Sequence, residues 1–502
     1  MNADAARRYL PHGVIAAVAL LAIAFPGETG ARVQGLAGAF LRHFDWLTLL
    51  VASGAVLVCA VVVLLPIGRH RIGGTTATPE FRLVTWLSML FAAGMGAGLV
   101  FWGAAEPLIH FLNPPPGGPA PASDDARRLA LALTQFHWSL HAWAVYAVAA
   151  LAIAAFAGRG HAPLPSSPLV PASGKLRRTV DWIALIAVLV GVVASVSAGA
   201  LQMGAGVARV SGGSLPNSPL SQSVLLVLLT AAYLTSVVAG LRRGIAFLSN
   251  VNMGLALVLA LYFLFAGPTA QILTALGESA SAYLSELLSL STQLRAEGEA
   301  RQWTRDWSLT TLLWWIAWTP FIGTFIARIS YGRRLRTLVL GVLLVPTLVT
   351  LIWFSLLGGT ALHLAAEGVD LGVSDFATAP AATYAVLEHL PLTKLTQSLT
   401  LLLVFTFLLT SADSGAYVLG MFSRGTMEDP PLAERLFWGL VIAVLSGAAI
   451  LSAGGQSVVR AFAVSGAIPM VLLLAVQAGA LLYRWTWWVQ SHTTTRSATE
   501  SP

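Results

Sequence analysis

Charged side chains are scarce in this chain. Asp, Glu, Lys and Arg make up 10% of its 502 residues, whereas hydrophobic residues make up 56%. Soluble domains carry about 25% charged residues because their surfaces face water. A water-soluble or a disordered chain of this composition is therefore excluded. The apolar runs reach about 20 residues, the length at which a helix crosses a bilayer. The composition predicts an all-α polytopic membrane protein, because helices satisfy their own backbone groups in lipid.

Cysteine is nearly absent too. Cys59 is the single cysteine and lies inside an apolar run, which excludes disulfides within the chain and metal or iron–sulfur sites built from several cysteines. The net charge of +7 is typical of loop arginines that orient a membrane protein, so we expect no nucleic-acid partner. The first apolar run, 14–25, ends in Pro26 and Gly27 without a small-residue cleavage site. We expect it to remain as a membrane helix.

Twelve apolar runs alternate with charged or Pro/Gly-rich stretches and predict twelve membrane spans. Their approximate limits are 12–26, 46–66, 83–112, 129–157, 180–208, 222–241, 247–267, 307–329, 337–360, 394–422, 433–452 and 458–486. In the two long segments between runs, 268–306 and 361–393, we expect amphipathic surface helices at 270–290 and 381–390. The proline-rich segment 158–179 predicts an extended connector.

The basic residues predict the orientation, since loops on the cytoplasmic side carry an excess of Lys and Arg. If the N-terminus is cytoplasmic, 19 of the 29 basic residues fall on that side. They are Arg7, Arg8, Arg69, Arg71, Arg82, Arg159, Lys175, Arg177, Arg178, Arg242, Arg243, Arg328, Arg333, Arg334, Arg336, Arg424, Arg435, Arg484 and Arg496. This bias predicts a multi-pass protein of the cell inner (plasma) membrane, surrounded by lipid, with both termini in the cytoplasm.

Glycine and proline interrupt two of the predicted spans. The third span contains three glycines within residues 94–98, near its middle. Small residues there favour either close helix packing or an unwound segment whose backbone carbonyls face a cavity. The eighth span carries Pro320, which removes a backbone donor in mid-helix, and Gly323 follows it. We expect a break in each span.

The two interruptions are five spans apart, and because five is odd, the five-helix units that begin with them would be inverted relative to each other. This pattern is typical of secondary transporters, whose binding site lies where the repeats meet. The predicted organisation is two N-terminal helices (1–79), a first repeat of helices 3–7 (80–267), an extracytoplasmic amphipathic segment (268–306), a second repeat of helices 8–12 (307–488) and a short polar cytoplasmic tail (489–502).

Aromatic side chains gather beside both interruptions. They are Trp138, Trp143 and Tyr146 on the fourth span and Trp315, Trp318 and Phe321 on the eighth. At the helical period each set falls on one face. Aromatic stripes more often serve packing, yet two of them beside two interrupted helices favour a ligand site. Tryptophan and tyrosine rings bind quaternary ammonium through their quadrupoles, at roughly 0.5–2 kcal/mol per contact.

Four stretches carry a resemblance to a known family. They are Gly94-Met95-Gly96-Ala97-Gly98 with Gly103-Ala104-Ala105-Glu106-Pro107; His137-Trp138-Ser139-Leu140-His141-Ala142-Trp143-Ala144-Val145-Tyr146; residues 314–321 followed by Phe325-Ile326-Ala327-Arg328-Ile329-Ser330; and Thr410-Ser411-Ala412-Asp413-Ser414. Over residues 80–460 the chain resembles the betaine/choline/carnitine transporters. The resemblance implies twelve helices, the last ten in a LeuT-like core of two inverted five-helix repeats, and a homotrimer.

The resemblance also implies a substrate site. Its aromatic box would be Trp138, Trp143, Tyr146, Trp315 and Trp318, with Trp314 and Phe321 close by and with Gly94, Met95, Gly96 and Gly98 of the interrupted third helix beside it. Gly98 matches the betaine carriers of the family, because proton-driven choline carriers tend to have aspartate there.

A sodium site is implied in the same way, between the third and tenth helices. Its ligands would be the carbonyls of Ala92, Met95 and Phe407 and the hydroxyls of Thr410 and Ser411. Oxygen donors suit a hard cation, whereas the alternative for the two hydroxyls is bonding back to their own helix. Members that exchange substrates without sodium have an arginine at the position of Asn252. Val188 and Val192 stand where sodium-coupled members have threonines for a second ion, so we expect one sodium ion.

Several ionisable residues lie near or within the spans. Glu106 precedes a proline, and we expect it at a helix end; Asp413 is expected in structural pairing or in gating, and Arg460 is a candidate by its position alone. His137 and His141 are four residues apart, but without a third ligand nearby in sequence they do not predict a metal site.

The sequence thus predicts a secondary transporter. It would import a quaternary-ammonium compatible solute, above all glycine betaine, coupled to sodium by alternating access. The alternative is proton-driven or exchange transport of choline or carnitine. An enzyme is disfavoured because the chain offers no Ser/His/Asp or Glu-rich metal constellation, and the aromatic plug disfavours an open channel. We expect no cofactor other than sodium as the coupling ion.

Overall fold

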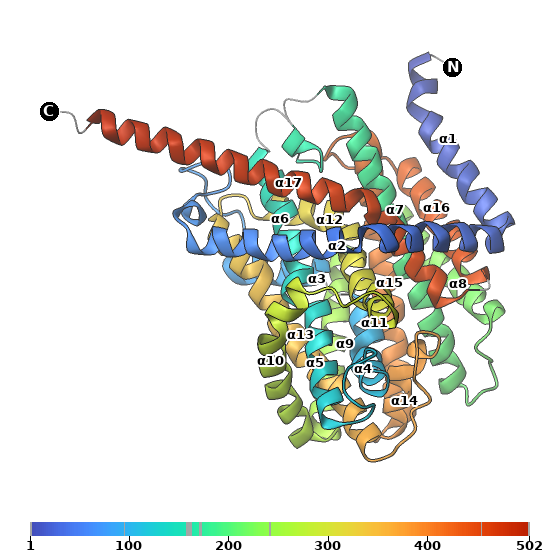
Figure 1. The fold of residues 1–502 in the computed structure, drawn as a ribbon. Coiled ribbons are helices and arrows are strands. Elements are labelled where there is room, and N and C mark those ends of the chain that lie inside the picture. The colour runs from blue at the N-terminus through green and yellow to red at the C-terminus, as the bar shows by residue number, and fades with distance from the viewer. Residues whose placement is uncertain are drawn as a thin grey trace.

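The computed structural model describes the chain except residues 1–2, 95, 157–162, 170–172, 240–241, 453 and 500–502, and the described part is a bundle of helices (Figure 1). Ten helices of the described part are long and apolar enough to cross a membrane. Two shorter apolar helices, Pro11–Ala24 and Ala97–Leu112, lie within the first and third predicted spans. Each of the twelve predicted spans therefore has its helix, and the all-α polytopic fold is confirmed.

The elements follow one another in this order. The first half contains α1 (Ala3–Ala24), α2 (Pro26–Leu64), η1 (Pro66–Arg69), α3 (Leu83–Gly94), α4 (Ala97–Leu112), α5 (Asp124–Trp138), α6 (Leu140–Phe156), η2 (Ser167–Leu169), α7 (Gly174–Val210), α8 (Pro219–Ala239) and α9 (Arg242–Ala266). The second half contains α10 (Thr269–Thr292), α11 (Glu299–Thr304), η3 (Arg305–Leu309), α12 (Thr310–Ile329), α13 (Leu335–Ala366), η4 (Ala379–Ala381), α14 (Ala382–Glu388), α15 (Thr393–Arg424), α16 (Leu432–Leu451) and α17 (Gln456–Thr499).

The second helix is longer than its predicted span. α2 begins at Pro26, where proline costs no hydrogen bond because the first helical N–H is unpaired in any case, and it includes residues 27–45. It crosses the bundle in Figure 1 and packs against α6 and α17. A kink at Phe44 (φ −128°, ψ 20°) divides it.

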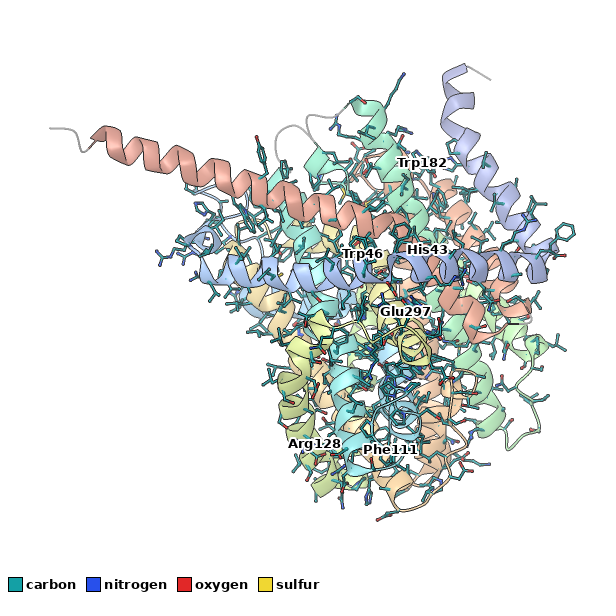
Figure 2. All side chains as sticks on the ribbon, viewed as in Figure 1. His43, Trp46, Phe111, Arg128, Trp182 and Glu297 are labelled. Carbon is teal, nitrogen blue, oxygen red and sulfur yellow. The ribbon has the colours of Figure 1, made fainter. Side chains whose placement is uncertain are left out.

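A buried ion cluster stands at this kink. The carboxylate of Asp45 accepts hydrogen bonds of 2.8 Å from the Nε atoms of Arg301 and Arg305. Arg305 also pairs with Glu297 at 3.0 Å, and Figure 2 shows Glu297 close to the part of α2 that carries Trp46. Because Arg305 opens η3, the cluster ties α2 to the start of the eighth span.

The third span is broken where its glycines predict. α3 ends at Gly94 and α4 begins after Gly96, whose extended backbone (φ −142°, ψ −154°) starts a new helix without a side-chain cap. Met95 lies outside the described residues. The prediction of an interrupted third helix is confirmed.

The fourth span is also broken, although no glycine or proline in it predicts a break. Ser139 separates α5 from α6 with φ −103° and ψ −123°. The N–H of Leu140 donates to the Tyr283 hydroxyl oxygen at 3.3 Å. The Ser139 hydroxyl donates to Gln135 Oε1 at 2.8 Å and lies 3.0 Å from the Thr350 hydroxyl. Side chains from α10 and α13 thus stabilise a break that its local sequence does not encode.

The eighth span is continuous through Pro320, so the predicted break there is wrong. α12 runs from Thr310 to Ile329. Proline cannot donate to the carbonyl of Ile316, but the hydroxyl of Thr319 donates to that carbonyl at 2.7 Å. This bond replaces the missing backbone donor and keeps the helix regular. The irregular turn of this span is the π-helical η3, which precedes α12.

Outside the predicted spans, the two expected helices are present, and two further segments are more helical than expected. The surface helix predicted at 270–290 is α10, which packs against α5 and α13, and α14 lies within 381–390. The described part of the connector, 163–169, contains η2. The tail that follows Trp488 was not predicted as a helix, yet α17 continues to Thr499.

The packing of the helices brings the interrupted and aromatic segments together. α12 contacts α6, α7 and α17, while α15 contacts α7 and α9, and α4 contacts α5 and α13. The third, fourth, eighth and tenth predicted spans therefore meet at the centre of the bundle, where the site residues were expected.

Candidate functional site

A cavity of about 650 Å³ lies at this centre, between α3, α4, α5, α6, α7, α9, α12, α15 and α17. Most predicted site residues line it: Gly96, Gly98, Trp138, Tyr146, Trp314, Trp315, Trp318, Phe321, Phe407, Thr410 and Ser411. Ala92 and Gly94 belong to the last turn of α3, and Met95 lies outside the described residues. Segments 300 residues apart in the chain thus converge on one space.

Trp315 is the centre of the aromatic box. Its ring centroid lies 5.3 Å from that of Trp138, with the two planes at 89°, and 5.6 Å from that of Tyr146, with the planes at 66°. Such edge-to-face pairs are the favoured geometry of aromatic rings. All three side chains line the cavity.

Trp143 stands behind the cavity and not in its wall. Its side chain is fully buried, with its ring 6.0 Å from that of Trp315 and 5.7 Å from that of Tyr146. The predicted arc assumed one continuous fourth helix, whereas the break at Ser139 changes the register between Trp138 and the residues of α6. Trp143 supports the rings that line the cavity.

Trp318 and Phe321 extend the aromatic lining along α12. Their centroids are 5.7 Å apart, and both side chains line the cavity. The indole of Trp318 rests on α7 at Gly191, where an added Cβ would lie 3.0 Å from its Nε1. The absence of a side chain at Gly191 thus allows the close approach of the indole to α7, and a larger residue would displace the indole by a few tenths of an ångström.

A polar group whose members were not expected to meet borders the cavity beside Trp138. We call it the Glu106 cluster: Glu106, His110, His137 and Ser308. Glu106 Oε2 accepts a 2.6 Å hydrogen bond from the indole Nε1 of Trp138, and Oε1 lies 2.5 Å from His137 Nδ1. His137 Nε2 lies 2.8 Å from the Ser308 hydroxyl. Glu106 is within α4 and buried, so the prediction of a helix-end role is wrong.

Three members of the cluster have the chemistry of metal ligands. One ligand atom each of Glu106, His110 and His137 lies within 4.8 Å of the others. Nδ1 of His110 has no hydrogen-bond partner among the described residues, whereas histidines that bind metal normally donate their second nitrogen to an acceptor. The bonds of Glu106 to Trp138 and His137, and of His137 to Ser308, form a hydrogen-bond network. His141 lies elsewhere, 3.1 Å from the Ser291 hydroxyl.

A second aromatic group lies on the same part of the cavity. Trp307 and Phe376 are stacked with centroids 3.7 Å apart, and the Arg460 guanidinium lies 3.5 Å from the Phe376 centroid. All three line the cavity. Phe376 comes from the loop before η4, so sequence spacing gave no signal that it would meet Arg460 of α17.

Hydroxyl groups of α15 face the break between α3 and α4. A Cβ built on Gly96 would lie 3.8 Å from Ser411 Oγ. The Thr410 hydroxyl donates back to the Phe407 carbonyl at 2.9 Å and accepts a 3.4 Å bond from Asn252 Nδ2. Oδ1 of Asn252 is buried without a partner in the described part of the chain. The residues present are neutral oxygen donors, which fit a sodium ion.

Asp413 is paired on the far side of α15. It is fully buried, accepts from the Ser236 hydroxyl at 2.7 Å and lies 3.4 Å from Arg435 Nη2. Structural pairing and gating were the two roles expected for Asp413. Its bonds to Ser236 and Arg435 correspond to structural pairing.

Comparison with known proteins identifies the family. The family model described as "BCCT, betaine/carnitine/choline family transporter" matches residues 8–487. The chain belongs to this family. It is 38% identical over 476 residues to the glycine betaine transporter OpuD of Bacillus subtilis, covering 93% of this chain and 92% of that one. It is 35% identical to the ectoine/hydroxyectoine transporter of Virgibacillus pantothenticus, covering 93% of each chain. It is also 35% identical to a glycine betaine/proline/choline transporter of Vibrio parahaemolyticus, covering 89% of this chain and 84% of that one.

Membership gives this betaine/carnitine/choline family transporter a LeuT-like fold. The inverted repeats are therefore supported by membership of the family. The break expected at Pro320 gives no support, because α12 is continuous there. At the two positions considered for a second ion, Val188 and Val192 are fully buried. Val192 packs on α15, 3.0 Å from a Cβ built on Gly415. These apolar side chains supply no oxygen to a cation.

Proposed function

We propose that this transporter imports glycine betaine together with sodium by alternating access. The observation that carries the proposal is the arrangement of Trp138, Tyr146 and Trp315 around one cavity. A trimethylammonium group is permanently charged and has no conventional hydrogen-bond donor or acceptor. Ring faces in a desolvated site are its chemical complement. The glycine betaine transporter of Bacillus subtilis among the relatives supports this substrate class.

The carboxylate of such a substrate also finds a complement in the cavity. Gly96, Ala97 and Gly98 line the cavity at the start of α4, and this helix start has no side-chain cap. The first N–H groups of a helix are unpaired and carry the positive end of its dipole. They would bind the carboxylate while the aromatic box binds the ammonium group.

Sodium would bind between α15 and the end of α3. The supporting observation is that Thr410 and Ser411 line the cavity beside the break after α3. A cation held there would fix α15 against the end of α3 next to the substrate. Ion and substrate would then stabilise the same conformation, which is the thermodynamic condition for coupling their binding.

Proton-driven or exchange transport of choline or carnitine is the alternative. One observation favours the proton version: the buried Glu106 and His137, which are hydrogen-bonded to each other beside the cavity. Ionisable residues within membrane spans often relay protons in transporters. Sodium dependence of uptake separates the two mechanisms.

We further propose a homotrimer in the inner (plasma) membrane with both termini in the cytoplasm. The orientation is supported by the bias of basic residues, 19 of 29 on the cytoplasmic side. Exposed leucines along α8 and α9, including Leu220, Leu228, Leu257 and Leu261, suit contact with lipid.

Uptake into proteoliposomes tests the function. Purified protein should accumulate radiolabelled betaine when an inward sodium gradient is imposed, and the accumulation should vanish when potassium replaces sodium. A panel of betaine, choline, carnitine and ectoine defines the substrate. Uptake that does not depend on sodium and is abolished by a protonophore would support the proton-driven alternative. Absence of uptake and of binding for every quaternary amine would refute the proposal.

A further inference from the structure

The indole of Trp138 is held by a carboxylate at one edge. Its Nε1 donates to Glu106 Oε2 at 2.6 Å, and both side chains are more than nine-tenths buried. Hydrogen bonds to a carboxylate are about twice as strong as neutral ones, and burial strengthens them further. This bond joins α4 to the last residue of α5.

The other edge of the same ring faces the same helix. A Cβ built on Gly98 would lie 3.4 Å from Cη2 of Trp138. Glu106 and Gly98 are eight residues apart on α4, which is about 12 Å along a helix. The long side chain of Glu106 reaches the nitrogen, and the bare backbone at Gly98 receives the six-membered ring. α4 thus contacts the indole at both ends.

Trp138 depends on such contacts because its own helix ends there. Ser139 leaves the helical conformation directly after it, so α6 does not continue the turn that would enclose the indole. Its remaining ring neighbours are Trp315 and Phe354, each with a centroid 5.3 Å away. These neighbours limit tilting of the ring, whereas the bond to Glu106 fixes which edge points to α4.

Glu106 is itself held in place. Its second oxygen, Oε1, lies 2.5 Å from His137 Nδ1, and His137 Nε2 lies 2.8 Å from the Ser308 hydroxyl. The indole N–H of Trp138 donates to one carboxylate oxygen, and the His137 imidazole contacts the other. Both oxygens have a buried partner, so the orientation of the carboxylate is fixed where it meets the indole nitrogen.

We propose that Glu106 is a positioning residue of the substrate site, acting through Trp138. It fixes the orientation of the indole, and by accepting the N–H it polarises the ring so that its face attracts a cation more strongly. The affinity for quaternary ammonium is set by this carboxylate through the ring that it orients, and both side chains line the cavity. The inference rests on the proposed function for its ligand, but the bond itself can be tested without any ligand.

The first test is a double-mutant cycle on betaine binding, measured with purified full-length protein. Glu106→Gln keeps an oxygen acceptor and removes the charge, and we expect it to raise the Kd about tenfold, as for the loss of a charge-assisted bond. Trp138→Phe keeps an aromatic face and removes the N–H. In the Trp138→Phe background, Glu106→Gln should change the Kd less than twofold, because the two residues act as one unit.

An equal loss in both backgrounds would overturn the proposal, since Glu106 would then act without Trp138. Glu434→Gln is the matched control: Glu434 is another buried glutamate that accepts from a histidine, His12 Nε2 at 3.0 Å, but it lies outside the cavity wall. This variant should bind betaine as the unmodified chain does.

The second test needs no substrate. In protein labelled with 5-fluorotryptophan, the ¹⁹F resonance of Trp138 is assigned as the one that disappears in Trp138→Phe. Glu106→Gln should shift or broaden this resonance, and Glu434→Gln should leave it in place. An unmoved resonance would refute the positioning role even if betaine is transported. A moved resonance in a protein that binds no quaternary amine would refute the proposed function and leave the Glu106–Trp138 relationship established.

Discussion

Trp315 meets Trp138 edge to face, with ring centroids 5.3 Å apart and planes at 89°, although the two residues belong to helices 177 positions apart in the chain. With Trp143 and Tyr146 as further neighbours, Trp315 has more ring partners than any other residue of the aromatic box. Trp315→Leu should weaken betaine binding about five- to thirtyfold, because a lost cation–π contact in a dry site costs roughly 1–2 kcal/mol. Equilibrium binding of labelled betaine measures this. Trp46→Leu, at a half-exposed tryptophan on α2, is the control that should not change the Kd. Equal effects of the two would contradict the role of the box.

The hydroxyl of Thr410 allows a test of ion coupling. Thr410→Ala should raise the sodium concentration for half-maximal uptake severalfold while the protein still folds, because one oxygen donor is removed from the cavity. Thr400→Ala is the matched control: Thr400 lies on the same helix, is fully buried and bonds back to the Thr396 carbonyl at 2.8 Å. Sodium dependence of uptake in proteoliposomes is the measurement. An unchanged sodium requirement in Thr410→Ala would remove this residue from the ion site.

The bond from Thr319 to the Ile316 carbonyl predicts a stability effect. Thr319→Val leaves that buried carbonyl without a donor, and it should lower the free energy of unfolding by about 1–2 kcal/mol. Pro320→Ala restores a backbone N–H, so the same Thr319 substitution should cost much less in the Pro320→Ala background. Thermal unfolding in detergent compares the variants. Equal losses in both backgrounds would show that the Thr319 hydroxyl does not compensate for the proline.

The cluster at the kink of α2 predicts a larger effect. Asp45→Ala leaves the buried Arg305 and the partly buried Arg301 without their shared carboxylate, and removing one partner of a buried ion pair costs about 3–5 kcal/mol. We expect a marked drop in the thermal midpoint. Asp124→Ala is the control, because the Asp124 side chain is 95% exposed and lies 3.6 Å from Arg127; surface pairs contribute about 0–1 kcal/mol. A drop no larger than that of Asp124→Ala would show that the kink does not depend on Asp45.

The sequence predicts those features of the site that arise from residue type. Glycines at 94–98 predict the break after α3, because glycine tolerates departure from the helix. Tryptophans at helical spacing on two spans predict rings that meet. Hydropathy predicts the twelve spans, because lipid demands long apolar helices. Each of these signals lies within one segment of the chain.

Features that depend on partners from other segments could not be predicted. The break at Ser139 needs Tyr283 and Thr350, on two helices far away in the sequence. Pro320 was expected to interrupt its helix, but the hydroxyl of the preceding threonine compensates for it. Glu106 was expected at a helix end because it precedes a proline. Its contacts with Trp138 and His137 depend on the packing of α5 against α4, which the local sequence does not contain. The spacing of Glu106 and His110, four residues apart on one helix face, was an available signal.

The helical conformation is interrupted at Ser139, between Trp138 and Tyr146. The two aromatic side chains that this span contributes to the cavity therefore belong to separate helices, α5 and α6. Their directions follow from two helix axes instead of one, and the wall of the cavity is assembled from shorter, independently oriented pieces.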